Sequence, residues 1–168
     1  LPASARDPHV SIVKLTLDAP VSGVLFGSAL ANASEHEIPG SMTFTPENAQ
    51  LSEGMTVVGE GKDAAIRWEN AEDTISWPLE IDSPGKYTVQ LTASCEGAGS
   101  IMTAHFGKNI KGVHGPIPVT GNHDNYQDFN LRTVYFPNAE STRLTLRPGH
   151  PHAWKTIQLK SLKLIPSN

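Results

Sequence analysis

Polar and apolar residues alternate with a period of two through the middle of the chain. In residues 74–81 (TISWPLEI) every second side chain is apolar, and the same spacing returns in residues 87–91 (YTVQL). This period predicts β-strands with one buried face. Between them, residues 82–85 (DSPG) have the composition of a tight turn, so we expect an antiparallel hairpin. Pro78 lacks a main-chain donor, which predicts a sheet edge or a bulge at that position.

Short segments of the same kind recur along the rest of the chain. No stretch keeps a helical period over three turns, and the 14 glycines and 13 prolines suit many strands joined by turns. We therefore predict an all-β fold, an antiparallel two-sheet β-sandwich. The expected strands lie at residues 42–45, 55–58, 65–67, 73–81, 85–93, 100–106, 108–113, 128–136, 141–146 and 156–165.

The N-terminal part differs from the rest. Residues 10–17 (VSIVKLTL) predict a strand, and the polar residues 32–41 (NASEHEIPGS) predict a linker or long loop. We expect residues 1–40 to be an N-terminal extension, the end of a preceding β-domain plus a linker, with residues 41–168 forming the sandwich. The alternative is that residues 10–17 pair on the sandwich edge, because their apolar face needs a partner.

Charge and cysteine content narrow the function classes. The 13 basic and 17 acidic residues give a net charge of −4, which argues against nucleic acid or an anionic membrane as partner. No apolar run approaches the length of a membrane span. Cys95 is the one cysteine, so the chain has no internal disulfide. Its apolar neighbours predict a small buried residue rather than a nucleophile.

From about residue 44 to residue 165, the order of these features resembles the galactose-binding-like jelly roll of carbohydrate-binding modules, families 6 and 35 in particular. The matching segments are residues 44–49 (FTPENA), 66–68 (IRW), 73–77 (DTISW), 84–89 (PGKYTV), 119–121 (VTG), 141–146 and 157–164.

A closer resemblance is to the C-terminal modules of secreted α-L-fucosidases and some sulfatases. It lies in the W-x-N-x-x-D-x-x-x-W run from Trp68 to Trp77, the pair Gly99-Ser100, and the L-T-L-x-P of residues 144–148. The resemblance implies a non-catalytic module of a secreted or periplasmic glycoside hydrolase. Its partners would be an oligosaccharide or polysaccharide bearing fucose or galactose, and the parent catalytic domain.

The chain departs from these families at two places. Their structural calcium site uses a Glu-x-Glu pair and an Asp near the C-terminus, whereas this chain has Thr45 and Glu47, and residues 160–162 (KSL) contain no Asp. Calcium needs several oxygen ligands, so we expect no family-type calcium site and no cofactor. The T-G-G-W loop of the families becomes TGNHDNY here, which ends at Tyr126.

Three loops carry the candidate sugar-binding residues. Sugar recognition needs an aromatic face for the C–H side of a pyranose and polar groups for its hydroxyls. The resemblance implies that the three loops meet at one end of the sandwich. Of the aromatics, Trp154 is the candidate exposed platform, Trp68 is either a platform or a core residue, and Trp77 is expected in the core. The full set of candidates is Trp68, Asn70, Asp73, Asn122, His123, Asn125, Tyr126, His152 and Trp154.

Two other function classes are compatible with the sequence. The domain is alternatively a structural accessory that packs on its catalytic partner without binding sugar, which an apolar patch away from the loops would favour. It is alternatively a jelly-roll enzyme with a metal site, which a cluster of His123, His150 and His152 would favour. No catalytic motif supports the enzyme, and paired carboxylates such as Glu72 and Asp73 are typical of a solvated loop.

Overall fold

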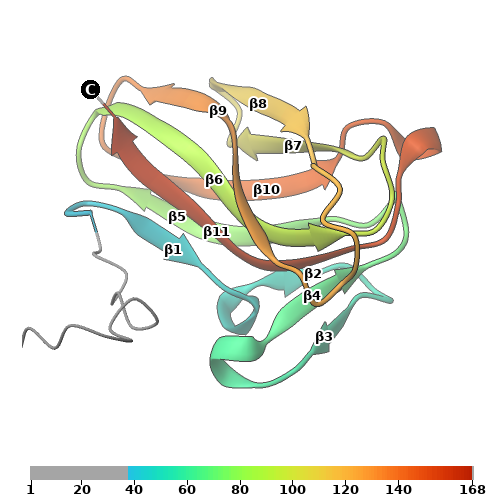
Figure 1. Ribbon diagram of the computed structural model, residues 1–168. Helices are drawn as coiled ribbons and strands as arrows, with labels where there is room; N and C mark the ends of the chain where they lie inside the picture. Colours follow the sequence, from blue (N-terminus) through green and yellow to red (C-terminus); the bar gives the residue numbers. More distant parts are fainter. Residues whose placement is uncertain (1–37, 168) are drawn as a thin grey trace, which may run out of the picture. The chain divides into compact units, whose positions relative to one another are not determined.

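Two antiparallel β-sheets pack face to face in the computed structural model, which describes residues 38–167 (Figure 1). These residues belong to one compact unit, so the predicted β-sandwich is confirmed. The strand expected at residues 10–17 and nearly all of the expected extension, residues 1–40, lie outside the described residues.

The larger sheet has the strand order β3-β4-β11-β6-β9, with β1 also paired to β11. Its long strands β6 and β11 run side by side through the centre of the sheet. The strands span Met42–Phe44 (β1), Thr56–Val58 (β3), Ala65–Trp68 (β4), Gly85–Cys95 (β6), Gln127–Phe136 (β9) and Ile157–Ser167 (β11).

The smaller sheet has the order β2-β5-β10-β7-β8. Its strands span Gln50–Leu51 (β2), Ile75–Ile81 (β5), Ile101–Phe106 (β7), Ile110–Pro116 (β8) and Glu140–Pro148 (β10). Each of the ten predicted strand ranges overlaps a strand of the structure. Strand β2 is not predicted from the sequence, because two residues are too few to display an alternating pattern.

Short 3-10 turns are the helical elements of the described residues. They lie at Pro46–Asn48 (η3), Gly61–Asp63 (η4) and Pro151–Ala153 (η5). Within residues 38–167, no helix has the length and apolar character needed to cross a membrane.

The predicted hairpin at residues 82–85 is wrong. Strands β5 and β6 belong to different sheets, so this turn carries the chain from one sheet to the other. The hydroxyl of Tyr87 donates a hydrogen bond to the main-chain oxygen of Ser83 at 2.8 Å, which fixes the crossing. The same turn residues serve a hairpin or a crossing, because their composition sets the local φ values and not the partner strand.

Pro78 lies on a sheet edge, as the sequence predicts. Strand β2 pairs with only Ser76 and Ile75 of β5, so β5 beyond them is paired with β10 alone among the described strands. Pro78 sits opposite Arg143 of β10. The missing main-chain donor of proline is therefore accommodated without a lost ladder bond.

Aromatic side chains from both sheets meet in the core. Phe106 of the smaller sheet packs edge-to-face on Phe136 of the larger sheet, with ring centroids 5.5 Å apart. Trp77 lies 5.9 Å from Phe44 and donates from Nε1 to the main-chain oxygen of Thr45 at 2.9 Å. The expected burial of Trp77 and of Cys95 is confirmed.

Four connections between the sheets lie at one end of the sandwich. They join β4 to β5, β6 to β7, β8 to β9 and β10 to β11, and strand register places them together: Ile157 at the start of β11 is opposite both Trp68 and Cys95, where β4 and β6 end. We call this end, made of residues 69–74, 96–100, 117–126 and 149–156, the loop end. It is at the right in Figure 1.

Replacing Trp77 with phenylalanine tests the core described above. Trp77→Phe removes the hydrogen bond to Thr45 and leaves a small void, so we expect the free energy of unfolding to fall by about 1–3 kcal/mol in urea titrations. The control Val57→Ala removes an exposed side chain and should change it by less than about 0.5 kcal/mol. Equal effects of the two variants would contradict the assigned role of Trp77.

Candidate functional site

Two tryptophans pack against each other beneath the loop end. The ring centroids of Trp68 and Trp154 are 5.2 Å apart, with an interplanar angle of 56°. Trp68 is 0% exposed and Trp154 is 9% exposed. The expectation that Trp154 forms an exposed platform is therefore wrong, and Trp68 is a core residue. Because Trp68 follows Ile66 at a two-residue spacing on β4, its side chain takes the inward direction of that strand.

The W-x-N-x-x-D run shapes the β4–β5 loop. The Nε1 of Trp68 donates to the main-chain oxygen of Asn70 at 3.0 Å, and the side-chain Oδ1 of Asn70 accepts from the main-chain nitrogen of Glu72 at 3.1 Å. Asp73 is buried, and its main-chain nitrogen donates to the Asn70 oxygen. The motif that is most informative in the sequence therefore has a structural role, although Asn70 itself is exposed.

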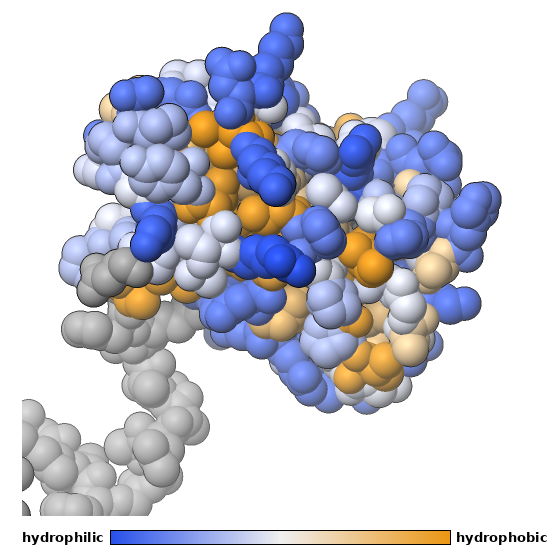
Figure 2. Space-filling view, turned by 90° about the horizontal axis from the view of Figure 1, so that it is seen from above, coloured by the Kyte–Doolittle hydropathy of each residue, from blue (hydrophilic) through white to orange (hydrophobic). Residues whose placement is uncertain are grey.

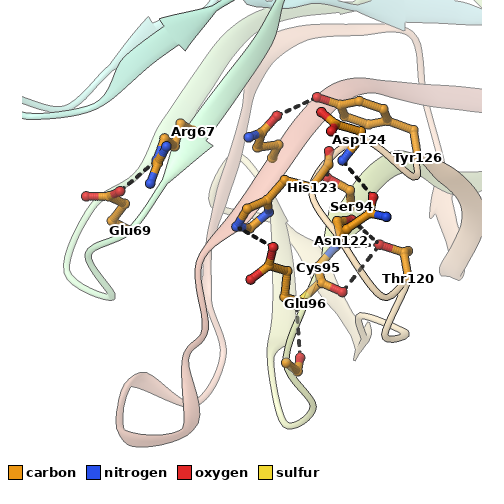
Figure 3. A network of polar contacts seen from close by, with 12 residues as sticks. Arg67, Glu69, Ser94, Cys95, Glu96, Thr120, Asn122, His123, Asp124 and Tyr126 are labelled. Carbon is orange, nitrogen blue, oxygen red and sulfur yellow. Dashed lines mark hydrogen bonds and ion pairs between the residues drawn. The ribbon is translucent and has the colours of Figure 1, made fainter.

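The β8–β9 loop is anchored by Thr120, which is buried against the end of β6 (Figure 3). Its main-chain nitrogen donates to the Cys95 oxygen at 2.8 Å, and its Oγ1 accepts from the Cys95 nitrogen at 3.0 Å. The hydroxyl proton has two acceptors in reach, the main-chain oxygens of Asn122 at 3.0 Å and Cys95 at 3.3 Å. This residue ties the loop to the larger sheet.

Further bonds hold the rest of this loop in one conformation. The Nδ2 of Asn125 donates to the Thr120 oxygen at 2.6 Å, and Ser94 Oγ donates to the His123 oxygen at 2.7 Å. The Oδ1 of Asn122 accepts from the Asp124 nitrogen at 3.0 Å. The side chains of Asn122 and Asp124 are nevertheless exposed. A loop that is rigid before binding loses less conformational entropy when a ligand arrives.

Tyr126 lies on the outer face of the larger sheet, half-buried. Its hydroxyl donates to Gln158 Oε1 at 2.6 Å, and Lys160 Nζ lies 5.2 Å from the ring centroid. Lys160 occupies a β-bulge of β11, since Leu159 pairs with Ala93 and Ser161 with Thr92; bulges redirect side chains in this way. Burial, and then the nearby charge of Asp124, raise the pKa of Tyr126, so its hydroxyl remains a donor at neutral pH.

The histidines of the loop end do not form a metal site. His123 is half-buried, with Nε2 3.9 Å from Glu96 Oε1, while His150 and His152 are exposed beside and within η5. Among residues 38–167, no three His, Cys, Asp or Glu side chains are grouped so that they would hold a metal ion. The geometry that would favour a metal-dependent enzyme is therefore not found in the part of the chain that the structure describes.

Of the nine candidates, four come together on one loop: Asn122, His123, Asn125 and Tyr126. Trp68, Asp73 and Trp154 support the loops from below, while Asn70 and His152 are exposed on the neighbouring connections. Thr120, Ser94 and Gln158 also hold the site together and are not among the residues predicted from the sequence. Strand alternation predicts that two of them, Ser94 and Gln158, point to the outer face, because each stands between inward-facing neighbours. The anchoring role of Thr120 has no local signal.

Comparison with known proteins supports the fold. No protein-family model matches the chain, and no curated protein does. Among solved structures, the C-terminal family 6 carbohydrate-binding module of a marine laminarinase from Zobellia galactanivorans matches with a TM-score of 0.64 and 13% identity. The match covers 74% of this chain and 98% of that chain.

Two further modules match at similar levels. The family 6 module from Cellvibrio mixtus lichenase 5A, in complex with cellotriose, has a TM-score of 0.61 and 18% identity over 76% of this chain and 98% of that chain. A family 35 module from Clostridium thermocellum has a TM-score of 0.61 and 7% sequence identity. That match covers 74% of this chain and 98% of the module. Parts of insecticidal crystal toxins match as well. The chain therefore has the jelly-roll fold of family 6 and 35 modules.

Removing the Thr120 hydroxyl tests the anchoring of the β8–β9 loop. Thr120→Val keeps the shape but leaves the Cys95 amide without its acceptor, so we expect the free energy of unfolding to fall by about 1–3 kcal/mol. The Cys95 amide should also exchange its hydrogen faster. Thr120→Ser retains the hydroxyl and should cost less than about half as much; equal losses for valine and serine would contradict the role of the hydroxyl.

Proposed function

We propose that this domain is a non-catalytic carbohydrate-binding module that binds its sugar at the loop end. One observation carries the proposal: the two tryptophans beneath the loop end are packed inward, and the loops expose polar side chains such as Asn122 and Asp124 on a backbone that hydrogen bonds hold in place. The exposed groups include an amide, a carboxylate and imidazoles, which are the partners that sugar hydroxyls require. The likeness in fold to family 6 and 35 modules supports the same function.

The sugar would lie over the β8–β9 loop, next to Tyr126. The Asp124 carboxylate accepts hydrogen bonds from hydroxyls, and the Asn122 amide both donates and accepts. The Tyr126 ring, half-buried, offers its exposed part to the C–H groups of the sugar. Polar partners of this kind must replace the water that hydrates each hydroxyl, so the net affinity is low, roughly millimolar to micromolar or about −4 to −8 kcal/mol.

Fucose- and galactose-bearing glycans are the proposed ligands. Support comes from the sequence, in which the Trp68-to-Trp77 run and the L-T-L-x-P segment resemble those of modules of secreted α-L-fucosidases. The module would then hold a secreted or periplasmic catalytic domain on its polymeric substrate. The cellotriose complex of the Cellvibrio mixtus module makes a glucan the natural comparison ligand.

Calorimetric titration of the chain with fucosylated, galactosylated and glucan oligosaccharides tests the proposal. Tyr126→Ala and Asp124→Ala should each weaken binding by about 1–3 kcal/mol, because one removes apolar contact area and the other a hydroxyl acceptor. Tyr126→Phe keeps the ring and should retain most of the affinity.

Glu80→Ala is the matched control for Asp124→Ala, since Glu80 is an exposed carboxylate near the end of β5 that is opposite the loop end. Variants at Trp68 or Trp154 are unsuitable because both rings are packed in the structure. A folded wild-type chain that binds none of these oligosaccharides would refute the proposal and favour a structural accessory domain. Loss of affinity in Glu80→Ala but not in Asp124→Ala would move the site elsewhere.

A further inference from the structure

Tyr135 is the most exposed large hydrophobic residue among those the structure describes, at 61%. It stands near the end of β9 opposite the loop end, directly across from Lys86 on β6. Facing residues on adjacent strands are in contact distance of each other, so the phenol and the ammonium group share one part of the surface.

Two hollows flank Tyr135. One, of about 470 Å³, lies on the outer face of the larger sheet and is lined by Lys86, Thr133 and Ser167 as well as Tyr135. The other, of about 490 Å³, lies between β8 and β9. Both are in the size range of small-molecule sites. Figure 2 looks down on the side of the sandwich where β8 and β9 lie, and it shows apolar residues at the surface with hydrophilic residues around them.

The charges around these hollows have one sign. Lys111 and Arg132 line the hollow between β8 and β9, beside the imidazole of His114, and Lys86 lines the other. No Asp or Glu is among the residues that line either hollow. This concentration of cations contrasts with the net charge of −4 for the chain. The Nε of Arg132 donates to the main-chain oxygen of His114 at 3.1 Å, which orients the guanidinium.

We propose that the surface made by Lys86, Lys111, His114, Arg132 and Tyr135, the Tyr135 surface, binds an acidic polysaccharide whose sugar rings carry carboxylate or sulfate groups. A sugar ring stacks on the phenol, and its acidic substituents reach the cations in the two hollows. Arg132 suits this role because an oriented guanidinium binds a carboxylate or sulfate through two parallel hydrogen bonds.

This site is independent of the proposed sugar site at the loop end. Tyr126 and Tyr135 lie at opposite ends of β9. Tyr126 directly precedes the strand, and Tyr135 is the residue before its last. At about 3.3 Å per residue, nine residues of strand separate the two rings by roughly 30 Å. One long polysaccharide chain can therefore engage both surfaces, whereas a short oligosaccharide engages one.

Calorimetry with acidic and neutral oligosaccharides of equal length tests the proposal on the full chain. The probes are oligogalacturonate for carboxylates, a sulfated galactan oligosaccharide for sulfates, and an unsubstituted galactan oligosaccharide. We expect at least one acidic probe to bind, and Tyr135→Ala and Arg132→Gln each to weaken it about tenfold. Tyr135→Phe should retain the affinity. The probe that binds identifies the acidic group.

Lys62→Gln is the matched control, since Lys62 is an exposed cation. It lies in η4, between β3 and β4, at the edge of the larger sheet opposite β9. The variant should change the affinity by less than about twofold, because salt screens distant charges. Absence of binding to both acidic probes would overturn the proposal. Equal losses of affinity in Lys62→Gln and Arg132→Gln would also overturn it, because they would indicate attraction by charge alone. Binding of a single-stranded oligonucleotide through Tyr135, as tight as that of the acidic probe, would overturn it as well.

If Tyr135→Ala still binds the neutral oligosaccharide, the loop-end site is intact in that variant. If the same variant loses binding to the acidic probe, the Tyr135 surface is supported. The two proposals therefore succeed or fail separately in one set of titrations.

Discussion

Packing of Trp154 against Trp68 closes one end of the sandwich, and the loop end depends on this contact. The two rings come from β4 and from the connection after β10, which are far apart in sequence. Burying such large apolar surfaces is worth several kcal/mol by area. Both rings lie inside, while Asn122, Asp124 and His152 of the loop end are exposed.

Hydrogen bonds hold the polar β8–β9 loop in one conformation. Thr120 ties the β8–β9 loop to the end of β6, and Ser94 ties it again through the His123 oxygen. On the adjacent outer face, the β11 bulge brings Lys160 beside Tyr126. All three devices use the larger sheet as the rigid support, which is the general arrangement of binding residues on loops held by a scaffold.

Local patterns predict the strands well, because apolar side chains recur at every second residue within a strand, as in residues 87–91. They do not predict which strands pair: residues 82–85 satisfy a hairpin, yet the turn crosses between sheets. Nor do they predict whether a ring in a loop is exposed. Trp154 follows a Gly-Pro segment typical of surface, yet it is buried in the core, where it packs against Trp68 from β4. The bond from Cys95 to Thr120 spans 25 residues and has no signal in either segment.

The central claim is that sugar binds over the polar β8–β9 loop and not on a tryptophan face. Two-dimensional NMR spectra recorded with fucosyllactose at about 10 mM, above the weakest affinity expected, test it directly. We predict that the main-chain amides of residues 121–126 shift progressively while the indole N–H signals of Trp68 and Trp154 stay in place. Large shifts of those two indole signals, with unchanged amides in residues 121–126, would contradict the account.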